Sequence, residues 1–182
     1  MRQFSTLAIA GIPGAGKTEL ATRLHAEFGW PVISTGDIAR TVDPVSLAAG
    51  KLADEDKFRT AFLKAYYDLR YLQGAMGRVI LDGIPRSRAQ LDLIPEATII
   101  ALTCRIDIAI DRQISRGREG DYREIIEART MEQADLLEVN RADGWLYIVA
   151  GWGRVINTQY KSPDTVAEQV AAYLRAEKRE AF

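Results

Sequence analysis

The chain has 182 residues, enough for about one domain of ordinary size with a small excess. Hydrophobic residues make up 47% and charged residues 27%, a composition that excludes disordered and collagen-like chains. The 24 basic and 25 acidic residues leave a formal net charge of −1, so nonspecific nucleic-acid binding through surplus Lys and Arg is not expected.

The first predicted element is a buried strand over Ser5–Ala10. Its apolar run is too short for a signal peptide, and a glycine-rich loop follows it at once. No apolar run in the chain approaches the about 18 residues that span a bilayer. We therefore expect a soluble, cytoplasmic protein with no membrane partner.

The glycine-rich loop reads GIPGAGKT and fits the pattern G-x-x-x-x-G-K-[ST] between a predicted strand and a predicted helix. Its glycines permit a backbone that points successive N–H groups inward, and the helix N-terminus adds partial positive charge. Lys17 is expected to reach the β- and γ-phosphates, and the Thr18 hydroxyl to ligate Mg²⁺. The loop predicts nucleoside triphosphate binding but does not distinguish a kinase from an ATPase or a GTPase. The residues expected to bind ATP here are Gly11, Pro13, Gly14, Ala15, Gly16, Lys17 and Thr18.

Short apolar runs alternate with helical patterns along the rest of the chain. Four-residue repeats predict helices after the loop and over 54–73, and Ser162-Pro163 is a good start for the last helix. Residues 145–149 fit either a strand or the end of a helix that starts near Tyr122. The alternation predicts a three-layer α/β fold with a parallel five-stranded sheet flanked by helices. The predicted strands are Ser5–Ala10, Pro31–Ser34, Arg78–Leu81, Ala97–Leu102 and Arg154–Thr158.

One carboxylate follows the third predicted strand. Asp82 stands where the carboxyl end of a parallel strand would meet the phosphate loop. From there it would hold Mg²⁺ through water, together with Thr18.

Four further segments suggest a second anion site. They are ISTGDIAR over 33–40, AGKLAD over 49–54, DGIPRSRAQ over 82–90, and the arginines at 112, 116, 118 and 129 around a glycine-containing loop. With the phosphate loop, these motifs resemble those of the nucleoside monophosphate kinases, and within them the adenylate kinases, in the same order. The resemblance runs from about residue 6 to residue 174. Phosphoryl transfer between two nucleotides needs many converging cations, which agrees with this set of arginines.

The resemblance implies a P-loop kinase that transfers a phosphoryl group reversibly from Mg-ATP to a nucleoside monophosphate, AMP or dAMP in the first place. Arg112 would lie over the donor adenine, and Asp121 would orient the lid arginines. Arg40 and Arg86 would hold the acceptor phosphate, and Thr35 and Gln90 would contact its base. The implied catalytic residues are Lys17, Arg86, Arg116, Arg118 and Arg129. The implied acceptor site comprises Thr35, Arg40, Leu52, Ala53, Gly83, Arg86 and Gln90.

The chain departs from this family in three places. The acceptor-binding insert, expected over about 35–74, is about one helix shorter, and the lid, expected over about 112–122, is very short. One cysteine and one histidine cannot build the zinc site of the long-lid form. Ile84 stands in place of the usual Phe. We expect a single domain over 1–182 that acts as a monomer.

Two alternatives remain open. The chain could be another small-molecule P-loop kinase with a different anionic or hydroxyl acceptor. It could also be a nucleotide-binding regulatory protein with residual ATPase activity, which would hydrolyse ATP slowly whether or not AMP is added.

Overall fold

The fold is described from a computed structural model of the chain. It describes residues 5–49, 51–74, 77–117, 122–138, 144, 146, 150–151 and 154–180, with side chains as far as residue 176.

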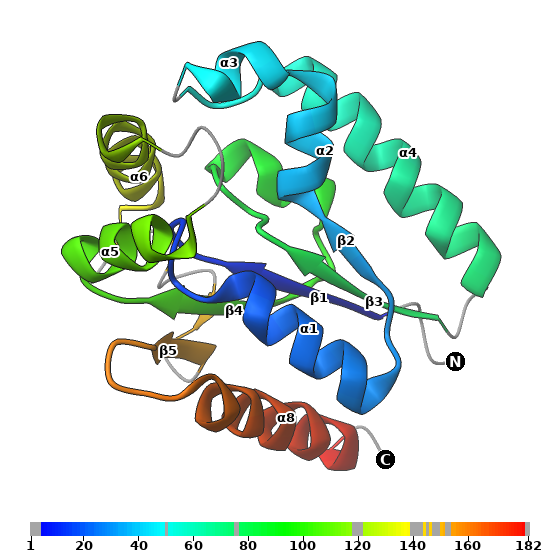
Figure 1. The fold of residues 1–182 in the computed structure, drawn as a ribbon. Helices are drawn as coiled ribbons and strands as arrows, with labels where there is room; N and C mark the ends of the chain where they lie inside the picture. Colours follow the sequence, from blue (N-terminus) through cyan, green and yellow to red (C-terminus); the bar gives the residue numbers. More distant parts are fainter. Residues whose placement is uncertain are drawn as a thin grey trace.

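A parallel five-stranded sheet forms the centre of the molecule, in the order β2-β3-β1-β4-β5 (Figure 1). Every predicted strand is present, with bounds shifted by at most one residue at either end, so the predicted fold is confirmed. The register places Ile9 and Ser34 beside Asp82, so that the carboxyl ends of β1, β2 and β3 meet at one edge. The strands are β1 Ser5–Ala10, β2 Val32–Ser34, β3 Arg78–Asp82, β4 Thr98–Thr103 and β5 Val155–Asn157.

Helices α1 (Lys17–Phe28) and α8 (Pro163–Glu180) pack against each other along one face of the sheet (Figure 1). Leu20 and Leu24 of α1 are buried, and so are Val166 and Val170 of α8, which are spaced one turn apart. The predicted start of the last helix is confirmed, because the Ser162 hydroxyl accepts a hydrogen bond of 3.1 Å from the backbone N–H of Thr165.

Three helices follow β2 and cover the predicted acceptor insert: α2 (Thr35–Val42), α3 (Pro44–Ala48) and α4 (Glu55–Gln73). Helix α4 begins where its sequence predicts, since the Asp54 carboxylate accepts from the N–H of Lys57 at 3.0 Å. Phe58, Phe62 and Tyr66 form its buried stripe. The Tyr66 hydroxyl lies 2.7 Å from the Thr6 hydroxyl of β1, which anchors the long helix on the sheet.

Helices α5 (Ile106–Arg116) and α6 (Arg123–Leu137) lie side by side beyond the carboxyl edge of the sheet (Figure 1). Between β3 and β4 the chain forms a short 3₁₀ helix, η1 (Arg88–Leu93). Helix α6 ends at Leu137. Leu146 is helical, whereas residues 145 and 147–149 lie outside the described residues.

The helices in the described part of the chain include none with the length and apolar character needed to cross a bilayer.

Candidate active site

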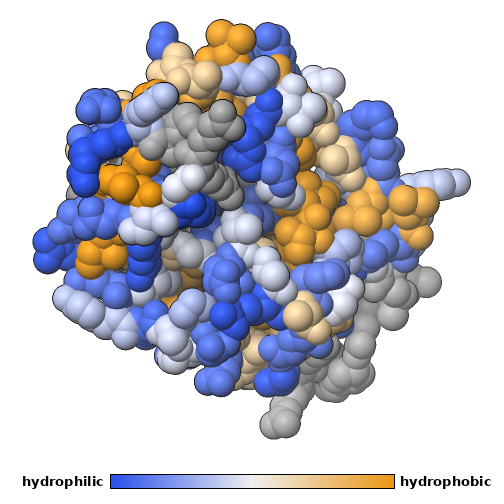
Figure 2. Space-filling view, in the orientation of Figure 1, coloured by the Kyte–Doolittle hydropathy of each residue, from blue (hydrophilic) through white to orange (hydrophobic). Residues whose placement is uncertain are grey.

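A cavity of about 1500 Å³ opens at the carboxyl edge of the sheet, between α2 and α3 on one side and α5 and α6 on the other. Figure 2 shows the surface hollowed in this region, with mainly hydrophilic residues around the opening. The volume exceeds the about 300–1000 Å³ typical of a site for one small ligand, so the cavity has room for more than one. The predicted residues that line it are Gly11, Pro13, Gly14, Gly16, Lys17, Thr18, Arg40, Leu52, Asp82, Gly83, Arg86, Arg112, Arg116 and Arg129.

The phosphate loop joins β1 to α1 and forms one wall of the cavity. Gly14 has a φ of +86°, and a Cβ at this position would lie 2.2 Å from the Ala109 carbonyl oxygen of α5. Only glycine fits that conformation and that close approach. Helix α1 begins at Lys17, so its N-terminal N–H groups and their partial positive charge face the cavity.

Lys17 is the central cation of this wall. Its ammonium donates a 2.8 Å hydrogen bond to the Ile12 carbonyl oxygen within the loop. The pKa of Lys17 is lowered from 10.5 to about 8, mainly by burial; Asp82 opposes this shift, and Arg86 and Arg116 add to it. A phosphate beside this ammonium would favour its charged form, so the site is matched to an anion.

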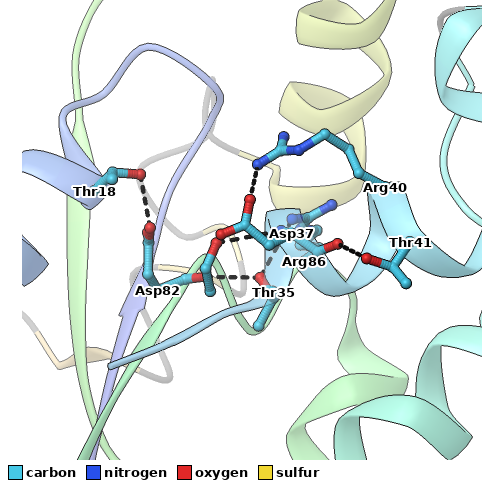
Figure 3. Close-up of polar contacts among 8 residues, drawn as sticks. Thr18, Thr35, Asp37, Arg40, Thr41, Asp82 and Arg86 are labelled. Atoms are coloured by element: carbon cyan, nitrogen blue, oxygen red, sulfur yellow. Dashed lines mark hydrogen bonds and ion pairs between the residues drawn. The ribbon is translucent and has the colours of Figure 1, made fainter. Parts of the chain in front are cut away.

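Thr18 and Asp82 bring two oxygen atoms together at the base of the cavity (Figure 3). The Thr18 hydroxyl donates to the Asp82 carboxylate at 2.6 Å. Oxygen ligands of this kind suit Mg²⁺, which keeps several waters and takes its remaining ligands from substrate phosphates. No group of three or more His, Cys, Asp or Glu that could hold a metal occurs among the described residues. The two oxygen atoms of Thr18 and Asp82 fit a Mg²⁺ ion that takes its other ligands from water and a phosphate.

Arg86 is held opposite the phosphate loop by a set of short polar contacts (Figure 3). Its Nε donates to the Gly83 carbonyl oxygen at 2.9 Å, and its Nη2 donates to the Thr35 hydroxyl at 3.3 Å. The Thr35 hydroxyl in turn donates to the backbone carbonyl of Asp82 at 2.7 Å. Thr35 therefore connects the start of α2, the end of β3 and the Arg86 guanidinium.

Three guanidinium groups converge on this part of the cavity. Burial lowers the pKa of Arg86, Arg40 and Arg129 lower it further through charge repulsion, and Asp82 opposes them. Arg40 forms an ion pair with Asp37 one turn earlier in α2 (Figure 3). Such a concentration of positive charge across the cavity from the phosphate loop suits an anionic group.

Helices α5 and α6 contribute three of the arginines that line the cavity, namely Arg112, Arg116 and Arg129. Arg112 donates to the Thr158 carbonyl oxygen at 2.9 Å and lies near the Gly14 carbonyl oxygen, at 3.4 Å. Arg116 and Arg129 line the cavity from the two helices. The predicted residues Arg118 and Asp121 lie outside the described residues.

Four predicted site residues are not among those that line the cavity: Ala15, Thr35, Ala53 and Gln90. Thr35 is fully buried, and its hydroxyl is used in the contacts with Arg86 and Asp82. The Gln90 carbonyl oxygen accepts from the Arg86 backbone N–H at 2.8 Å, and its amide nitrogen donates to Glu55 at 3.4 Å. Both side chains thus support the loop that carries Arg86.

The polar residues that line the cavity and that the sequence analysis did not identify include Asp37, Gln113 and Gln133. Gln133 follows Arg129 by four residues, so helical spacing alone could have placed it on the same face. Gln113 lies three residues before Arg116, a spacing that gives the same signal. Asp37 lies within the ISTGDIAR segment, and its spacing from Arg40 also fits one helix turn.

Four residues of the acceptor side form an apolar stretch of the cavity wall. They come from α3 and the loop that follows it: Pro44, Leu47, Ala48 and Leu52.

The fold and the loop geometry define a P-loop protein. A family model described as an AAA domain matches residues 10–132. Adenylate kinase from Synechococcus sp. (strain RCC307) is 30% identical over 92% of this chain and 97% of its own length. Adenylate kinase from Clavibacter michiganensis subsp. michiganensis (strain NCPPB 382) is 31% identical over 94% of this chain and 93% of its own length.

Solved structures show the same fold at low sequence identity. A gluconokinase from Sinorhizobium meliloti 1021 covers 100% of this chain and 97% of its own, with a TM-score of 0.69 and 14% identity. A sugar kinase from Janibacter sp. HTCC2649 reaches a TM-score of 0.69 at 16% identity, covering 94% of this chain and 95% of its own.

The sequence relatives decide the family within this fold. The chain belongs to the adenylate kinase family, and it is a P-loop kinase like the nucleoside monophosphate kinases.

Proposed function

We propose that this protein transfers the γ-phosphoryl group of Mg-ATP reversibly to a nucleoside monophosphate, and that AMP or dAMP is the preferred acceptor. The observation that carries the proposal is that Arg40, Arg86 and Arg129, from three separate segments, line the same cavity as the phosphate loop. A protein that only binds or hydrolyses ATP needs no such set of arginines. The names of the sequence relatives support adenine as the acceptor base.

The chemistry of the transfer asks little of the protein beyond alignment and charge. An oxygen of the acceptor phosphate attacks the γ-phosphorus in line, and the bond from that phosphorus to the β–γ bridging oxygen breaks, giving two diphosphates. The attacking oxygen is already anionic, so no general base is required. Lys17 and the arginines stabilise the charge on the moving group. Bound Mg²⁺, held by Thr18 and by Asp82 through water, would neutralise phosphate charge.

The acceptor end of the cavity favours a base over a polyhydroxylated acceptor. Its wall is apolar over Pro44, Leu47, Ala48 and Leu52, which suits the flat face of a nucleobase. A sugar acid would leave its hydroxyl groups without partners along this wall. The residues of α2, α3 and α4 would then act as the acceptor insert (about 35–74), and the end of α5 with the residues that follow it (about 112–122) as a short lid on a single domain.

Initial rates with Mg-ATP and a panel of ribo- and deoxyribonucleoside monophosphates test the proposal, with gluconate as a comparison acceptor. We expect AMP or dAMP to give the highest kcat/KM. Slow ATP hydrolysis that is indifferent to every monophosphate would contradict it, as would turnover with gluconate alone. We expect a monomer in size-exclusion chromatography and a cytoplasmic location.

Arg86→Met should separate acceptor binding from ATP binding. Loss of a charge-assisted hydrogen bond costs roughly 1.5–3 kcal/mol, so the acceptor KM should rise by about tenfold to 150-fold while ATP affinity changes little. Arg88→Met is the matched control, because Arg88 is exposed and pairs with Glu138. An unchanged acceptor KM in Arg86→Met would remove Arg86 from the acceptor site.

A further inference from the structure

Two buried glutamines lie among the cations of α5 and α6. Gln113 is fully buried and Gln133 is 3% exposed, although both also line the cavity. Glutamine side chains are mostly exposed in proteins, and a buried amide is costly unless its polar atoms are paired. The contacts of these two amides therefore indicate what they do.

Gln113 connects the phosphate loop to an arginine of the other helix. Its amide nitrogen lies 3.3 Å from the Pro13 carbonyl oxygen of the loop, 3.2 Å from the Ala109 carbonyl oxygen and 2.9 Å from the Thr130 hydroxyl. Its carbonyl oxygen accepts from the Arg129 Nη2 at 3.1 Å. The Gln113 amide thus connects the phosphate loop, helix α5 and the Arg129 guanidinium.

Gln133 makes the corresponding connection on the acceptor side. It lies one turn after Arg129 in α6, and its amide nitrogen donates to the backbone carbonyl of Arg86 at 3.1 Å. Helix α6 is therefore connected to the phosphate loop through Gln113 and to the backbone of Arg86 through Gln133. Arg129 lies between these two connections.

We propose that Gln113 is a positioning residue that holds the Arg129 guanidinium beside the phosphate loop, at the point where the phosphoryl group passes between the two nucleotides. This inference rests on the proposed function for its kinetic consequence. Gln113 does not need to touch either nucleotide, because its carbonyl oxygen acts through Arg129. A misplaced arginine weakens stabilisation of the transition state more than ground-state binding, so kcat should fall more than ATP affinity.

The decisive variant is Gln113→Met, which keeps the length and approximate volume of the side chain and removes every hydrogen bond. We expect kcat to fall by about tenfold to 100-fold, with the Kd for Mg-ADP within about threefold of the parent. Thr130→Val is the matched control. It removes one partner of the Gln113 amide and leaves the bond to Arg129, so kcat should stay within about threefold.

A double-mutant cycle separates positioning from a general effect on folding. In an Arg129→Met background, Gln113→Met should reduce kcat by less than about twofold, because the group it positions is gone. An equal reduction in both backgrounds would overturn the proposal. So would a loss of Mg-ADP affinity in Gln113→Met as large as the loss of kcat, because that pattern would mean a collapsed phosphate loop.

A second readout does not depend on the reaction. Nitrogen-15 NMR of the arginine side chains should show slow rotation of the Arg129 guanidinium in the parent protein and faster rotation in Gln113→Met. Unchanged rotation would refute the positioning role. If the parent protein turned over no monophosphate, the proposed function would fail, whereas the NMR result would still decide the role of Gln113.

Discussion

Thr35 gives the most direct test of how the acceptor side is built. Its hydroxyl donates to the Asp82 carbonyl oxygen at 2.7 Å and accepts from the Arg86 guanidinium at 3.3 Å, and the residue is fully buried. Thr35→Val preserves the shape and removes both contacts. Because the buried carbonyl oxygen of Asp82 would lose its hydrogen-bond donor, the free energy of unfolding should fall by about 1–3 kcal/mol. Thermal unfolding should then shift downward by about 2–4 °C per kcal/mol.

The kinetic effect distinguishes support of Arg86 from direct contact with the acceptor base. If Thr35 positions Arg86, the KM of every nucleoside monophosphate should rise by the same factor, about threefold to tenfold, with unchanged ATP affinity. If Thr35 contacts the base, as the family resemblance implies, the ranking of the bases should change instead. The assay is therefore initial rates for AMP, GMP, CMP and UMP at saturating Mg-ATP.

Two control variants complete the Thr35 experiment. Thr35→Ser keeps the hydroxyl and should restore the acceptor KM to near the parent value. Thr41→Val makes the same chemical change at an exposed helical hydroxyl and should cost less than about 0.5 kcal/mol. Our interpretation would be refuted if Thr35→Val were as stable as Thr41→Val and bound all four acceptors normally.

The remaining predictions concern Lys17 and Gly83. With a Lys17 pKa of about 8, kcat/KM for ATP should fall as pH rises through 8. At saturating ATP, kcat should stay constant to higher pH, because bound phosphate keeps Lys17 protonated. A constant kcat/KM from pH 7 to 9.5 would contradict this. Because the pKa of Lys17 is lower in the folded state, the unfolded chain binds more protons than the folded chain between pH 8 and 10.5. The free energy of unfolding of the parent, relative to that of Lys17→Met, should therefore increase as pH rises over this range. Gly83→Ala should destabilise the protein and impair acceptor use, because Gly83 has a φ of +98° and a Cβ would lie 2.7 Å from the Thr35 hydroxyl. Gly29→Ala is the control, because Gly29 has a φ of +68° and no atom lies near the new Cβ. Its free energy of unfolding should fall only by the backbone strain of about 1–2 kcal/mol. Equal free energies of unfolding for the two variants would show that no collision occurs at Gly83.

Local patterns were sufficient to predict most of the fold. The short apolar runs predicted the five strands because strands buried on both faces contain few polar residues. The phosphate loop was predictable for a similar reason, since its glycines and its Lys-Thr pair occupy fixed positions in one continuous segment. Caps such as Asp54 and Ser162 act on N–H groups three residues away, so they too can be read from sequence.

The supporting contacts of the site depended on tertiary structure. Gln113 and Pro13 are 100 residues apart, and Thr35 and Arg86 are 51 residues apart, so no local pattern links them. The family resemblance implied contacts of Thr35 and Gln90 with a base, whereas the fold engages both side chains in hydrogen bonds with the segment that carries Arg86. The sequence by itself determined which segments carry the charges, because motif chemistry is local. Only the packing of α5 and α6 against each other and against the phosphate loop decided which polar side chains hold those charges in place, because those partners meet only in the folded chain.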